Sequence, residues 1–148
     1  MLRTKRRLIL CLSLLAMNLA FIWGNSLLPG HISGAFSDWV KNILSAIFPL
    51  RPSQDGGGGL LRKLAHFTEF TCLGLILSWL FRMLREKKWE HLLLPLAAGI
   101  LAAATDETIQ IFVPNRGPAL KDVGIDTAGV LLGIVIINLI QHFKNRRK

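Results

Sequence analysis

The chain has 148 residues, of which 51% are apolar and only 18% are charged, and its mean hydropathy is +0.44. The length fits a single domain over residues 1–148, and the composition argues against a soluble protein, so long apolar stretches are the governing signal. The net charge of +9 could indicate nucleic-acid binding, but the basic residues cluster at the ends of apolar stretches, as membrane topology requires. We therefore expect a membrane protein with no nucleic-acid partner.

The first apolar stretch covers residues 8–28 and follows a basic cluster at residues 3–7. A basic start and an apolar run are also typical of a signal peptide. The run is long for a signal core, however, and no small-x-small cleavage pattern follows it. Leu10 precedes Cys11, where a lipoprotein signal would need a small residue. We expect the segment to be retained as the first transmembrane helix.

Residues 34–48 differ in kind, because apolar residues recur there at helical spacing with polar residues between them. Phe36, Trp39 and Ile43 belong to the apolar side. This pattern predicts a short amphipathic helix that lies in the membrane interface, with a partner-binding helix as the alternative. The glycine run 56–59 that follows predicts a flexible joint.

Three further apolar stretches follow, at residues 60–84, 92–113 and 123–143. Each is long enough to cross the hydrocarbon core, which needs about 20 mostly apolar residues. The predicted fold class is therefore all-α: a polytopic membrane bundle of four transmembrane helices, with the amphipathic interfacial helix on the outer side.

The distribution of Lys and Arg predicts the orientation of this bundle. Twelve lie in the N-terminal cluster, in the loop after the second span and at the C-terminus: Arg3, Lys5, Arg6, Arg7, Arg82, Arg85, Lys87, Lys88, Lys144, Arg146, Arg147 and Lys148. Six lie on the opposite side: Lys41, Arg51, Arg62, Lys63, Arg116 and Lys121. Because the cytoplasmic side carries the excess, we expect a multi-pass protein of a bacterial cytoplasmic membrane with both termini in the cytoplasm.

Five of the nine acidic residues lie in or beside the apolar stretches, all in the predicted outer half: Glu69, Asp106, Glu107, Asp122 and Asp126. Such residues are expensive in lipid and usually face the protein interior or a wet cavity. Three helix ends therefore converge on one polar layer. The candidate catalytic residues are His66, Glu69, Asp106 and Glu107, and the candidate binding residues are Lys63, Gln110, Arg116, Asp122 and Asp126.

Four of these residues also have a structural interpretation. Asp122 could cap the start of the last helix, where the helix dipole favours a carboxylate. Arg116 could be the ion-pair partner of Asp106 or Glu107. His66 and Glu69, three residues apart on one helix, could hydrogen-bond to each other.

The last span contains a GxxxG pair, Gly129 and Gly133, on the same helical face as Asp122 and Asp126. Such a pair lets another helix approach closely. The approach could occur within one chain or between two chains, in which case the protein is a homo-oligomer. A second shared face, on the third span, comprises Gly99, Ala103, Asp106 and Gln110.

In their order and spacing, these residues resemble the VanZ-like family of bacterial membrane proteins. The resemblance covers roughly Lys63 to Gly133. It is carried by Lys63-x-x-His66-Phe67-x-Glu69-Phe70 with Gly74, by Asp106-Glu107-x-x-Gln110-x-Phe112-x-Pro114-x-Arg116, and by Asp122-x-x-x-Asp126-x-x-Gly129-x-x-x-Gly133. Three positions depart from the family pattern: Phe70 stands where Tyr is common, Asn115 where Gly is usual, and Asp126 where Asn is frequent.

The resemblance implies a small polytopic protein of the cell envelope, and the founding member of the family is associated with reduced susceptibility to the glycopeptide teicoplanin. Our first functional hypothesis is binding or modification of an envelope lipid, or of the antibiotic, at the outer leaflet. Alternatives are a membrane-embedded enzyme acting on a lipid-linked substrate and a small proton-coupled transporter. In the enzyme, His66 or Glu69 would be the base, and Asp106 and Glu107 would bind a metal or supply the acid. The sequence contains no HExxH or phosphate-cradling motif, and we expect no resident metal and no cofactor.

Overall fold

The computed structural model describes residues 2–32, 35, 43, 58–117 and 119–146. Within these residues the chain forms four long helices and no strand, in the order α1 (Leu2–Ser26), α3 (Gly58–Leu84), α4 (Glu90–Ile111) and α5 (Leu120–Arg146). The predicted amphipathic segment 34–48 lies outside the described residues, apart from residues 35 and 43.

All four helices are long and apolar enough to cross a membrane, as predicted. The shortest, α4, has 22 residues, which at 1.5 Å per residue is about 33 Å, close to the thickness of the hydrocarbon core. A helix satisfies every internal backbone N–H and C=O without water, which is why these apolar segments adopt this form. The helices overlap all four predicted spans and differ from them by a few residues at the ends.

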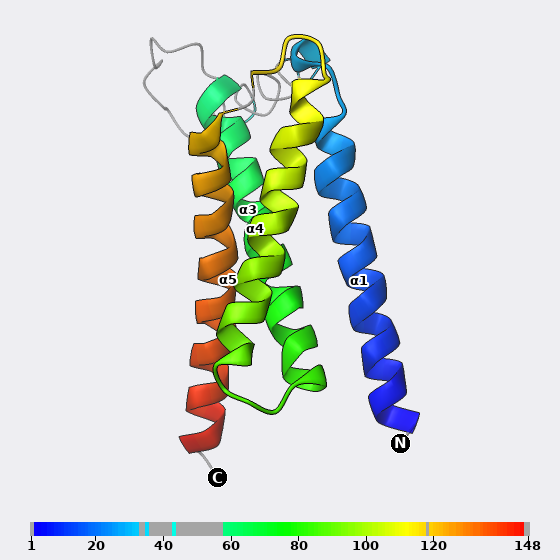
Figure 1. The fold of residues 1–148 in the computed structure, drawn as a ribbon, viewed down its shortest axis with the longest axis vertical. Coiled ribbons are helices and arrows are strands. Elements are labelled where there is room, and N and C mark those ends of the chain that lie inside the picture. The colour runs from blue at the N-terminus through cyan, green and yellow to red at the C-terminus, as the bar shows by residue number, and fades with distance from the viewer. Residues whose placement is uncertain (1, 33–34, 36–42, 44–57, 118, 147–148) are drawn as a thin grey trace.

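The helices run up and down, so that the N-terminus, the α3–α4 loop and the C-terminus lie at one end of the bundle (Figure 1). The end of α1 and the α4–α5 loop lie at the other end. We call the latter end the far end. An even number of spans requires this arrangement.

Helices α3 and α5 make the closest contact in the bundle, through glycines. A Cβ atom at Gly129 would lie 2.5 Å from the carbonyl oxygen of Phe67, and one at Gly133 would collide with the carbonyl oxygen of Thr71. On the α3 side of this α3–α5 contact, which we call the seam, a Cβ atom at Gly74 would collide with the backbone of Val130. The GxxxG pair therefore packs within the chain. It is buried against α3 and is not available for the contact between chains that the sequence also allowed.

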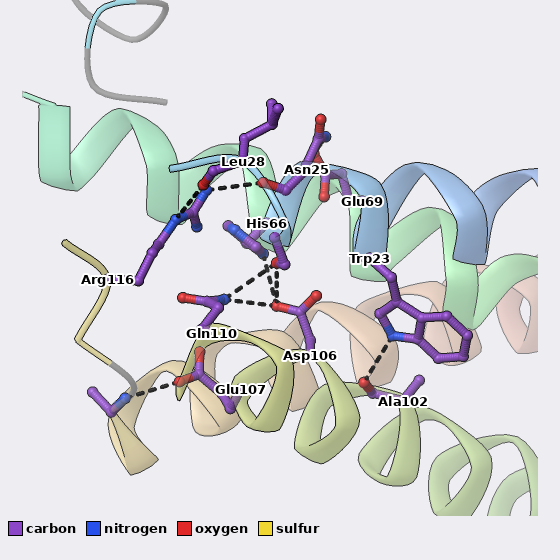
Figure 2. Close-up of polar contacts among 12 residues, drawn as sticks. Trp23, Asn25, Leu28, His66, Glu69, Ala102, Asp106, Glu107, Gln110 and Arg116 are labelled. Carbon is purple, nitrogen blue, oxygen red and sulfur yellow. Dashed lines mark hydrogen bonds and ion pairs between the residues drawn. The ribbon is translucent and has the colours of Figure 1, made fainter. Parts of the chain in front are cut away.

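The core lies between all four helices, and the predicted site residues of the spans lie on the side of it that faces the far end. Its members are Ile22 of α1, Phe70, Leu73 and Leu77 of α3, Ala102 and Ala103 of α4, and Val130 and Ile134 of α5. Helix α1 is anchored by Ile22 and by the indole N–H of Trp23, which lies 3.5 Å from the carbonyl oxygen of Ala102 (Figure 2). Many outward-facing side chains are large and apolar, as lipid contact allows.

Candidate functional site

A cleft at the far end of the bundle opens between α3, α4 and α5. It is small, with about 10 Å³ open to the centre of a water-sized sphere, within about 250 Å³ of space between atoms that includes open solvent. Its lining consists of Arg62, Lys63, His66, Glu107, Gln110, Asp122, Ile125 and Asp126. Three helix ends therefore contribute to one polar region, and six of the nine predicted site residues line it.

Asp106 lies beneath this cleft and is completely buried. Its Oδ2 accepts hydrogen bonds from the Ser26 hydroxyl and from Gln110 Nε2, each at 2.8 Å (Figure 2). His66 Nδ1 lies 3.8 Å from the same oxygen. Side chains from α1, α3 and α4 thus meet at one carboxylate, because an acid at this depth can be accommodated only with polar partners.

Asp126 is the second buried acid of the site, with only 2% of its surface exposed. Its Oδ2 has no hydrogen-bond partner among the described residues, and neither does Asp106 Oδ1 or His66 Nδ1. One potential ligand atom from each of these three residues lies within 4.8 Å of the other two. They are the described residues best placed to hold a metal ion.

The mouth of the cleft is basic on one side. Lys63 Nζ lies 3.4 Å from Asp122 Oδ1, and the Lys63 side chain is 43% exposed. Arg62, the next residue on α3, also lines the cleft. Exposed ion pairs of this kind add little stability, so Lys63 can exchange its partner at small cost.

Arg116 occupies a different place from the one predicted. Its Nη2 donates to the carbonyl oxygen of Asn25 at 2.9 Å, and its Nε donates to that of Leu28 at 3.2 Å (Figure 2). Asn25 is in the last turn of α1, where helix carbonyls lack intrahelical partners, and Leu28 lies two residues after the helix ends. Arg116 therefore caps α1. In the described part of the chain it forms no ion pair with Asp106 or Glu107, and it does not line the cleft.

Burial lowers the pKa of the Arg116 guanidinium, and the neighbouring positive charge of Arg62 acts in the same direction. The carboxylates of Asp106 and Glu107 oppose the shift. Because an arginine side chain stays protonated in proteins, the cap remains cationic.

The two predicted glutamates serve contacts between elements. Glu69 Oε1 accepts a hydrogen bond from Asn25 Nδ2 at 3.0 Å, so this side chain faces α1 and not His66. Glu107 Oε2 accepts the backbone N–H of Ala119 at 2.8 Å, just before α5 begins. The predicted His66–Glu69 hydrogen bond is therefore wrong, whereas Glu107 both ties the α5 start and lines the cleft.

Sequence reasoning missed Asn25, Ser26 and Arg62. The first two are a polar pair at the end of a mostly apolar run, and this position is a usable signal because polar residues in a span usually face protein. Arg62 is adjacent to Lys63, and the sequence pattern indicates only the side of the membrane on which it lies. Nothing in the local sequence shows that Ser26 reaches a residue 80 positions away in the chain.

The departures from the VanZ-like pattern have structural explanations at two positions. Asn115 has a φ of 60°, a left-handed conformation that Gly adopts freely and Asn tolerates better than most residues. Phe70 is completely buried in the core, so it contributes packing that needs no hydroxyl group.

Comparison with known proteins gives one family match. Residues 8–141 match the family model VanZ/LLP1, which is nearly the whole chain. No curated protein and no solved structure matches the chain significantly. The match includes most of α1, which the motifs between Lys63 and Gly133 did not cover.

Proposed function

The chain belongs to the VanZ/LLP1 family, and on this premise we propose that it binds an anionic headgroup at the outer face of a bacterial cytoplasmic membrane. The headgroup is that of an envelope lipid or of a lipid-like glycopeptide antibiotic. Binding or modification of this molecule would change susceptibility to teicoplanin. The founding member's link with that antibiotic supports the choice.

The observation that carries the proposal is the cleft at the far end, which pairs a basic mouth with an apolar bundle. Arg62 and Lys63 line its opening. A guanidinium and an ammonium group are the side chains that proteins use to bind phosphate and carboxylate groups. The lipid-facing helix surfaces beside the cleft are apolar and suit an acyl or isoprenoid chain.

Lys63→Ala tests this proposal directly, because the side chain is exposed and its loss removes only a weak ion pair. We expect a null host carrying this variant to lose the protection against teicoplanin that the wild-type chain confers. The reason is the loss of one of two cations at the mouth. The measurement is the minimal inhibitory concentration, with the membrane level of each protein checked by immunoblot.

Lys121→Ala is the matched control, since Lys121 is an exposed lysine at the same end of the bundle and outside the cleft lining. It should keep full protection. Equal protection by wild type and Lys63→Ala would contradict the proposal. Arg116→Ala is a poor test, because loss of the α1 cap would lower the amount of folded protein.

A membrane-embedded enzyme is the second candidate, and the position of His66 favours it. This imidazole lies 3.8 Å from Asp106 and lines the cleft, an arrangement that suits a general base held by a carboxylate. Release of phosphate or a changed headgroup, after purified protein is incubated with isoprenoid phosphates or phospholipids, would distinguish turnover from binding alone.

A further inference from the structure

We infer that His66, Asp106 and Asp126 form a binding site for one divalent transition-metal ion of the Zn²⁺ type, at the inner end of the cleft. This inference goes beyond headgroup binding and does not depend on it. It also differs from the sequence-based expectation that the protein holds no metal.

The arrangement of the three residues suits one metal ion. The three residues come from α3, α4 and α5, and one ligand atom of each lies within 4.8 Å of the others. Ligands of a tetrahedral Zn²⁺ ion, at bond lengths of about 2.0–2.1 Å, lie roughly 3.3 Å apart. The most distant pair therefore has to close by up to roughly 1.5 Å, which side-chain rotation can supply.

Each of the three residues also has a buried ligand atom without a hydrogen-bond partner. His66 Nδ1, Asp106 Oδ1 and Asp126 Oδ2 are buried and lack hydrogen-bond partners among the described residues. Asp106 is 0% exposed and Asp126 is 2% exposed. Unpartnered polar atoms at such depth are rare, because each costs about 1–3 kcal/mol when left unsatisfied. All three residues belong to the cluster that could hold a metal ion, so one bound ion would account for their unpartnered atoms together.

The charge of the cluster also favours a bound cation. Two carboxylates at this depth require a compensating cation if they are ionised. Among the basic groups nearby, Lys63 pairs with Asp122 and Arg116 donates to carbonyl oxygens at and just after the end of α1, while Arg62 lines the cleft without an ion pair to either buried acid. In the described structure no Lys or Arg pairs with Asp106 or Asp126. A divalent cation would neutralise both acids together.

The surroundings also resemble those of known metal sites. Ser26 and Gln110 hold Asp106 through Oδ2 and leave Oδ1 without a partner, as outer-shell hydrogen bonds orient a ligating carboxylate. An imidazole nitrogen and carboxylate oxygens are ligands that Zn²⁺ accepts. Three protein ligands leave a fourth position for water, and His66 and Asp126 both line the cleft through which that water would exchange.

Metal binding by the full-length protein in detergent tests the inference. Any polyhistidine tag is removed first, and the protein is stripped with EDTA. Zn²⁺ is then titrated by calorimetry, and Co²⁺ serves as a substitute whose visible absorption reports the coordination. We expect the wild-type protein to bind one ion per chain. Asp126→Asn and His66→Gln preserve side-chain shape and should weaken binding by at least the roughly 10- to 100-fold expected for loss of an outer-shell partner.

Glu69→Gln is the matched control, because it removes a carboxylate of α3 that faces Asn25 and contributes no atom to the cluster. It should bind Zn²⁺ like the wild type. The inference is overturned if the wild-type protein gives no Co²⁺ absorption band and no Zn²⁺ heat. It is equally overturned if Asp126→Asn keeps wild-type affinity, or if Glu69→Gln weakens binding as much as Asp126→Asn. The wild-type Co²⁺ spectrum decides the matter even if a variant does not fold.

Discussion

The position of Asp106 in the chain gives little indication of how this residue is held. It lies one turn before the end of an apolar helix. Its neighbours at the carboxylate come from three helices: Ser26 on α1, Gln110 on its own helix and His66 on α3. Hydrogen bonds to a charged group are worth more than those between neutral groups, and a buried acid without them is costly. The Ser26 hydroxyl is therefore a link between α1 and the site.

Ser26→Ala tests this link. It removes a buried donor to Asp106, and we expect the free energy of unfolding to fall by about 1–3 kcal/mol. The measurement is reversible unfolding in mixed detergent micelles. Ser13→Ala serves as control, because Ser13 is exposed on the same helix. Equal free energies of unfolding for the two variants would show that the hydrogen bond from Ser26 to Asp106 does not stabilise the protein.

At the scale of elements, the seam between α3 and α5 decides how the three helices of the cleft are spaced. Small residues let helix backbones approach closely, and in a membrane such packing replaces the hydrophobic driving force. Gly74, Gly129 and Gly133 all lie where a side chain would meet the backbone of the other helix. The close approach also brings Asp126, one turn before Gly129, toward α3.

Gly133→Ala should therefore destabilise the protein, by about 1–3 kcal/mol, because the added methyl group would collide with backbone atoms of α3 that cannot move aside. Thermal unfolding in detergent measures the effect.

Gly124→Ala is the matched control on the same helix, since a Cβ atom there meets nothing within 4 Å. It should be neutral or stabilising by up to about 1 kcal/mol, from the better helix propensity of Ala. Destabilisation of both variants by the same amount would mean that the seam is not closely packed.

For the whole molecule, the topology separates two ends of different chemistry. The termini and the α3–α4 loop lie together at one end (Figure 1), and the residues that line the cleft belong to the other end. Twelve of the 18 Lys and Arg residues belong to the end with the termini. The positive-inside rule then predicts that the cleft faces away from the cytoplasm.

Single-cysteine labelling tests this orientation. In a background with Cys11 and Cys72 replaced by alanine, we expect a membrane-impermeant maleimide to label Gly117→Cys on intact cells. Lys87→Cys, in the opposite loop, should react only after the cells are opened. Both positions are exposed. Labelling of Lys87→Cys but not of Gly117→Cys on intact cells would reverse the orientation.

The four spans followed from the sequence alone, because a bilayer accepts only long apolar helices whose backbone groups are satisfied internally. The gathering of acids at one end was also predictable, since ionisable residues in a span must face protein or water. The shared faces of α4 and α5 followed from the helical repeat, which is a local property.

Only the tertiary structure decided which side chain meets which. The sequence could not show that Arg116 caps α1, that Glu69 faces Asn25, or that Ser26 reaches Asp106. It also left open whether the GxxxG pair packs within a chain. These outcomes depend on the rotation and separation of helices that are distant in the chain. Packing over the whole interface sets that rotation and separation, and no local pattern does.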